Sequence, residues 1–126
     1  MEIRSRAAAE PFTTTDGSVI RSLLDRANAP VANASLAEAT LEAGESTTRH
    51  RHAVSEEMYY LVEGEGEMEL DGATRRVGVG DAILIPPGAR HRITAVGPGP
   101  LRLLCVCAPP WSAKDTLFDE DAPGPG

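Results

Sequence analysis

The sequence predicts an all-β protein, either a sandwich or a barrel of antiparallel strands, and three observations support this. Apolar residues recur in short runs of about five to eight, which is the usual length of a strand. Twelve glycines and ten prolines separate these runs as turn residues. After residue 30 the chain shows no convincing long helical pattern. Short strands joined by tight turns are the arrangement that such a sequence favours.

The length of 126 residues fits a single domain with one hydrophobic core. We divide residues 1–126 into an N-terminal arm over 1–30, a barrel core over about 31–110 and a C-terminal tail over 111–126. The arm is expected to pack on the core or to contribute to a dimer contact. The tail ends in DEDAPGPG, which is typical of a disordered segment without function.

Within the arm, residues 16–28 could form a short helix. Asp16 or Ser18 would cap its N-terminus, since both side chains can accept hydrogen bonds from the first backbone N–H groups. The residues on its inward face would be Ile20, Leu23 and Leu24.

From residue 31 onward, strand-like runs follow one another along the chain. We expect strands at 35–41, 56–64, 66–70, 73–77, 82–86, 91–96 and 101–108. Asp71-Gly72 lies between two of them and is a strong hairpin signal, because a type I′ turn requires positive φ at both central residues. The two flanking strands should therefore pair antiparallel.

Composition argues against several classes of function. The formal net charge of −7, with no run of lysine or arginine, disfavours binding to nucleic acid. No segment reaches the 18 or so apolar residues of a membrane span, and the N-terminus lacks the apolar core of a secretory signal. We therefore expect a cytoplasmic protein that binds neither membranes nor nucleic acid.

Cys105 and Cys107 are the only cysteines, and they lie two residues apart on a predicted strand. Their side chains would share one face at a separation of roughly 6.6 Å, which is poor geometry for a disulfide. We interpret them as reduced core residues and assign them no chemistry.

All three histidines of the chain lie near predicted turns or strands. His50 and His52 are two residues apart, so in a strand their side chains point to one face. Glu57 is close enough in sequence for the next strand to bring it beside them, and a tight turn could return His91 to the same place. Such a group could hold a metal ion, but spacing alone equally allows surface or hydrogen-bonded histidines without an ion.

Two motifs resemble those of the cupin superfamily, in particular its small bacterial single-domain members. The first is a glycine, His-x-His, glutamate and glycine at the superfamily's spacing, met by Gly44, His50, His52, Glu57 and Gly64. The second is met by Gly80, Pro86, Gly88 and His91, whereas Ala95 stands where asparagine is usual. The resemblance covers about residues 36–107.

This resemblance implies a double-stranded β-helix, or jelly roll, with a divalent transition metal held by His50, His52, Glu57 and His91. The change at Ala95 should matter little, because that asparagine is not a ligand in the superfamily. Imidazole and carboxylate donors suit Mn, Fe, Co, Ni, Cu or Zn better than Ca or Mg.

Octahedral coordination by four protein ligands would leave two positions open to a ligand. We therefore expect a metal-dependent enzyme acting on a small polar molecule, of isomerase, epimerase or dioxygenase type. The alternative is a non-catalytic module or sensor that binds a small ligand. Tyr59 shares strand parity with Glu57 and is a candidate acid, although it could equally pack its ring in the barrel. By resemblance, the expected assembly is a homodimer.

Overall fold

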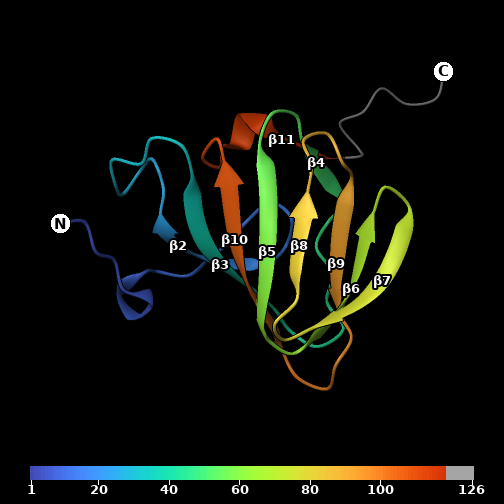
Figure 1. Ribbon diagram of the computed structural model, residues 1–126. Helices are drawn as coiled ribbons and strands as arrows, with labels where there is room; N and C mark the ends of the chain where they lie inside the picture. The colour runs from blue at the N-terminus through green and yellow to red at the C-terminus, as the bar shows by residue number, and fades with distance from the viewer. Residues whose placement is uncertain (119–126) are drawn as a thin grey trace.

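The computed structural model describes residues 1–118, and its regular secondary structure is almost entirely β-strand, arranged in two antiparallel sheets (Figure 1). The larger sheet contains β1 (Phe12–Thr13), β2 (Val19–Leu24), β3 (Ser35–Leu41), β10 (Leu101–Ala108), β5 (Glu56–Glu63) and β8 (Ala82–Ile85), in that order. The smaller sheet contains β11 (Thr116–Phe118), β4 (His50–His52), β9 (His91–Ala95), β6 (Glu65–Leu70) and β7 (Ala73–Gly78), in that order. Neighbours in space are mostly distant in sequence, which is the jelly-roll arrangement and confirms the predicted fold class.

Two short 3₁₀ helices, η1 (Arg6–Ala8) and η2 (Ala113–Asp115), complete the described structure. Across residues 1–118 no helix has the length and apolar character needed to cross a bilayer.

The core lies between the two sheets, because successive side chains of a strand point to opposite faces. In β5, Glu57, Tyr59 and Leu61 are buried. The intervening Met58 and Tyr60 are exposed on the outer face. Each fully buried leucine of this kind contributes about 1.5–3 kcal/mol of burial free energy. The same alternation that buries Leu61 therefore carries the Glu57 carboxylate into the interior.

The hairpin between β6 and β7 has the predicted turn. Asp71 and Gly72 have φ angles of 48° and 87°, and the flanking Leu70 and Ala73 are paired. The turn also contacts the loop that precedes β9. The Asp71 N–H donates to the Arg90 carbonyl at 2.8 Å, and the Arg90 N–H donates to the Asp71 carboxylate at 2.9 Å. This pair of hydrogen bonds fixes the backbone immediately before His91.

The helix predicted within residues 16–28 is wrong, because Val19–Leu24 forms strand β2. This strand pairs antiparallel with β3, where Ile20 lies opposite Ala39. Asp16 does not cap a helix; its carboxylate accepts the N–H of Ser18 at 2.9 Å and closes the turn before β2. Pairing with a neighbouring strand far along the chain outweighs a local helical pattern of this length.

The C-terminal segment is more structured than a tail. Residues 113–118, which the sequence analysis placed in that tail, form η2 and the edge strand β11. β11 pairs antiparallel with β4, so the end of the described chain lies directly beside His50 and His52. The DEDAPGPG segment, 119–126, lies outside the described residues.

Candidate metal centre

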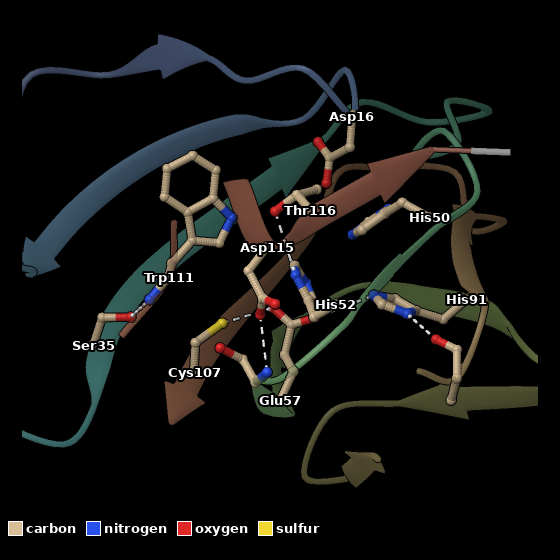
Figure 2. A network of polar contacts seen from close by, with 12 residues as sticks. Asp16, Ser35, His50, His52, Glu57, His91, Cys107, Trp111, Asp115 and Thr116 are labelled. Carbon is tan, nitrogen blue, oxygen red and sulfur yellow. Dashed lines mark hydrogen bonds and ion pairs between the residues drawn. The ribbon is translucent and has the colours of Figure 1, made fainter. Parts of the chain in front are cut away.

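Four buried side chains meet between the two sheets, and they are the four that the sequence singled out (Figure 2). His50 and His52 come from β4, His91 begins β9, and Glu57 reaches across from β5 in the other sheet. One ligand atom from each side chain lies within 4.8 Å of all the others. None of the four residues is more than 5% exposed. The convergence predicted from strand parity and a returning loop is therefore present.

Local backbone geometry places the histidines. In β4 the pattern His-Arg-His turns both imidazoles inward and Arg51 toward the outer face. His50 lies opposite His91 in the pairing of β4 with β9, and their ring centroids are 4.3 Å apart. The turn before β9 is tied to β4, since the Gly88 N–H donates to the His52 carbonyl at 2.7 Å. Gly88 adopts a φ of 82°, a conformation that favours glycine.

Backbone carbonyls fix the tautomer of two of the rings. His50 Nδ1 lies 2.7 Å from the Thr48 carbonyl oxygen, and His91 Nδ1 lies 3.0 Å from the Ala89 carbonyl oxygen. A carbonyl only accepts, so Nδ1 must carry the proton in both rings. The Nε2 lone pairs of His50 and His91 are therefore directed away from these carbonyls and are free to bind a cation.

The Glu57 carboxylate occupies the centre of the cluster. Its Oε1 lies 3.2 Å from His52 Nε2 and 3.1 Å from His91 Nε2. The second oxygen, Oε2, accepts a hydrogen bond from the Cys107 thiol at 3.3 Å. Cys107 was predicted to be a core residue without chemistry, and its spacing in the sequence does not indicate this hydrogen bond to a candidate ligand. Cys105 and Cys107 are both free, as predicted.

The donor set fits a cation. Within residues 1–118, His91 Nε2 is buried and has no hydrogen-bond partner, because its contact with Glu57 Oε1 is close but poorly aligned. With its proton on Nδ1, His91 directs an Nε2 lone pair toward a carboxylate oxygen. Two such electron-rich atoms repel unless a proton or a metal ion lies between them. A divalent cation between them would accept a lone pair from both His91 Nε2 and the Glu57 oxygen.

The electrostatics of the cluster keep Glu57 ionised. Burial raises the pKa of Glu57, but without a metal ion the hydrogen bonds and positive charge of protonated His52 and His91 outweigh burial and hold that pKa well below the ordinary range. Burial lowers the pKa of His52, but the hydrogen bond and the charge of Glu57 together raise it above the ordinary value. Burial and the nearby His91 lower the pKa of His50.

A cavity of about 110 Å³ opens onto the cluster and is lined by His50, His52 and Glu57. Its walls are mainly apolar, formed by residues such as Leu41, Ile93, Leu101 and Leu103. Tyr59 also lines the cavity, as its strand parity predicted. Burial, followed by the charge of Glu57, raises the pKa of the Tyr59 hydroxyl well above its ordinary value.

Three further lining residues were not identified from the sequence as part of a site. Asp16 comes from the N-terminal arm, and Trp111 and Thr116 come from the C-terminal segment. Figure 2 draws Asp16, Trp111 and Thr116 together with the four candidate ligands. The Asp16-Gly17 pair does mark a turn, but nothing local to it shows that the turn returns to a cavity.

Comparisons with known proteins identify the family and the fold of the chain. The cupin domain family matches residues 37–107, more than half of the chain. An uncharacterized protein of Methanocaldococcus jannaschii is 45% identical over 107 residues, which cover 85% of this chain and 86% of the relative. The polyketide synthase CurC of Streptomyces cyaneus is 31% identical over 109 residues, which cover 86% of this chain and 70% of the relative.

Among solved structures, the polyketide cyclase RemF of Streptomyces resistomycificus superposes with a TM-score of 0.80 at 24% identity. The superposition covers 94% of this chain and 85% of that one. At this level of identity the likeness concerns the fold. Together with the family match and the 45% identical relative, it shows that this chain is a member of the cupin domain family.

Proposed function

We propose that the protein binds one divalent transition metal through His50, His52, Glu57 and His91 and catalyses a reaction of a small molecule in the adjoining cavity. The observation that carries this proposal is the convergence of four buried ligand atoms within 4.8 Å. Three imidazole nitrogens and one carboxylate suit Mn, Fe, Co, Ni, Cu or Zn. When bound with open coordination positions, such an ion supplies Lewis-acid or redox chemistry.

Two side chains of the cavity could act on a bound molecule. The Tyr59 hydroxyl stays protonated because burial raises its pKa, so it can donate a hydrogen bond to a ligand oxygen. The Asp16 carboxylate is held through Oδ1 by the N–H and hydroxyl of Ser18, at 2.9 and 2.6 Å. Its other oxygen remains available as an acceptor or base. A donor and an acceptor in one cavity favour catalysis over binding alone.

The chemistry of the cavity supports a small oxygen-bearing substrate with an apolar carbon skeleton. Leucine and isoleucine walls would contact the skeleton, whereas Tyr59, Asp16 and the metal would face its oxygens. The similar proteins CurC and RemF carry names that include polyketide, CurC as a synthase and RemF as a cyclase. We therefore propose a small polyketide-like carbonyl compound as the substrate class, in place of a strictly polar molecule.

The second candidate function is a binding or sensor module, which the largely apolar walls favour. To separate the two, metal-loaded protein is incubated with aromatic β-dicarbonyl compounds, oxoacids and sugars, and products are followed by mass spectrometry. For an enzyme, Tyr59→Phe should lower kcat about 10²- to 10⁴-fold with little change in ligand affinity. Saturable binding of a compound that is always recovered unchanged would instead support the binding module.

Acidification should release the metal. The imidazoles must be neutral to coordinate, so affinity should fall as the pH drops below the ordinary imidazole pKa of about 6.5. Glu57 raises the pKa of His52, so protons compete with the metal there at a higher pH than at an ordinary imidazole, whereas Glu57 itself stays ionised. Dialysis at stepped pH followed by elemental analysis measures the release, and reloading at neutral pH excludes irreversible unfolding. Full retention at about pH 4 would contradict imidazole coordination.

We also propose that the protein is a homodimer. The outer face of the larger sheet exposes Met58, Tyr60 and Leu84, and Met58 lies opposite both Leu84 and Val106 in the strand pairing. A contiguous apolar strip over three strands is typical of an interface between copies. Light scattering that gives a monomeric mass would contradict this assembly. The cytoplasmic location stays a prediction from the sequence.

A further inference from the structure

The C-terminal strand β11 contacts both histidines of β4 on the side that faces the metal centre. Thr116 lies opposite His52 in the strand pairing, and Phe118 lies opposite His50. Thr116 and Phe118 are two residues apart, so they share one face of the strand. The Phe118 ring centroid lies 5.6 Å from that of His50, and the Thr116 hydroxyl lies 3.3 Å from His52 Nδ1.

The hydrogen bonds of Thr116 determine which His52 nitrogen carries a proton. The Thr116 hydroxyl donates its single proton to the Ser112 carbonyl oxygen at 3.0 Å. With that proton committed, the hydroxyl oxygen can only accept from His52 Nδ1. The Nδ1–H tautomer leaves the Nε2 lone pair directed at the cluster, where it is needed for coordination.

A competing arrangement exists for this ring. His52 Nε2 lies 3.2 Å from Glu57 Oε1, so a proton on Nε2 could be donated to the carboxylate. In that tautomer, His52 Nε2 would carry a proton in place of its lone pair, and its hydrogen bond would engage one oxygen of Glu57. Neither atom would then be available to a metal ion. His50 and His91 rely on backbone carbonyls to fix their protons, which no side-chain substitution removes. Among the three rings, only His52 depends on a side chain for this choice.

The segment that carries Thr116 is fastened to the loop between His52 and Glu57. The Asp115 carboxylate accepts the N–H groups of Val54 and Ser55 at 2.8 and 2.9 Å. The Ala53 N–H donates to the Asp115 carbonyl at 3.1 Å. These bonds hold η2 and β11 against the loop, so the hydroxyl of Thr116 is presented at a fixed position.

We propose that Thr116 is a positioning residue that selects the metal-binding tautomer of His52, and that residues 112–118 thereby form part of the metal centre. The ligand assignment rests on the proposed function, but the tautomer does not, because it exists in metal-free protein. Hydrogen bonds to the outer nitrogen of a coordinating imidazole orient the ring and raise its basicity, and their loss commonly lowers metal affinity about 10- to 100-fold.

The test compares Thr116→Val, which removes the hydroxyl at nearly constant volume, with Thr116→Ser, which retains it. In metal-free protein at about pH 9, above the usual titration of imidazole, long-range ¹H–¹⁵N spectra distinguish the two tautomers of His52. We expect Nδ1–H in the parent protein and in Thr116→Ser, and Nε2–H in Thr116→Val. Zinc affinity, measured by competition with a chelator, should fall about 10- to 100-fold in Thr116→Val and recover in Thr116→Ser.

Ser112→Ala is the matched control, because it removes the side-chain cap on the Asp115 N–H and keeps the carbonyl that accepts from Thr116. An Nδ1–H tautomer in Thr116→Val would overturn the inference, and so would an equal loss of affinity in Ser112→Ala without a change of tautomer. Failure of the parent protein to bind zinc would instead contradict the proposed metal site, since the tautomer is read without metal.

Discussion

Replacing His50 or His91 by alanine should reduce bound metal to background while the barrel remains folded. Each substitution removes one of four donors whose ligand atoms lie within 4.8 Å. The remaining side chains of the cluster cannot move to replace it, because their strands are fixed by pairing with neighbours. Elemental analysis of protein purified without affinity-tag histidines measures the metal, and far-UV circular dichroism checks the fold. Unchanged metal content in both variants would rule out the ligand assignment.

Glu57 offers a sharper comparison, because the chain supplies its own control. Glu57→Gln removes the charge of a buried carboxylate that contacts two imidazoles, so metal content should fall as in the histidine variants. Glu56→Gln makes the same chemical change one residue earlier, where the side chain is exposed on the outer face of β5. An equal fall in metal content in the two variants would show that net charge, and not coordination, governs binding, and full retention in both would show that Glu57 is not a ligand.

The largest loss of stability without a change in the metal ligands should come from Gly64→Ala. Gly64 has a φ of 83°, and a Cβ added there would lie 2.2 Å from the Pro100 carbonyl oxygen. The left-handed conformation costs about 1–2 kcal/mol for a residue with a Cβ. Forcing extra volume into a packed contact costs roughly 1–3 kcal/mol more. We therefore expect the free energy of unfolding to fall by roughly 2–5 kcal/mol.

Gly72→Ala isolates the two contributions. Gly72 has a similar φ of 87°, but a Cβ there would meet no atom within 4 Å. The free energy of unfolding of Gly72→Ala should therefore fall only by the cost of the left-handed conformation, about 1–2 kcal/mol. Urea unfolding of both variants, with unchanged slopes, measures the difference. If the two substitutions destabilise equally, the contact of Gly64 with Pro100 is not a close one and the account of this glycine is incorrect.

The cluster could be predicted because the two motifs that resemble the cupin superfamily supplied the ligand set, which local spacing alone left open. Strand alternation places His50 and His52 on one face, and the Asp71-Gly72 turn specifies a hairpin from its own φ requirements. The motif around Gly64 also has a local signature, and the structure gives its reason in the approach of Pro100. Where a feature is encoded within a few neighbouring residues, sequence and structure agree.

The remaining parts of the site depend on pairing between segments that are far apart in sequence. Val19–Leu24 has apolar residues at helical spacing, and only its pairing with β3 makes it a strand. Thr116 lies 64 residues from His52, and Cys107 lies 50 residues from Glu57. No local pattern reports such contacts. The residues that surround the ligands could therefore be identified only from the structure, whereas the ligands themselves could be predicted from the sequence.

Anomalous diffraction from a crystal of the metal-loaded protein would locate the bound ion. We expect one strong peak about 2.0–2.2 Å from His50 Nε2, His52 Nε2, His91 Nε2 and a carboxylate oxygen of Glu57. A peak at any other place in the molecule, or none at this cluster with metal in excess, would contradict the ligand assignment.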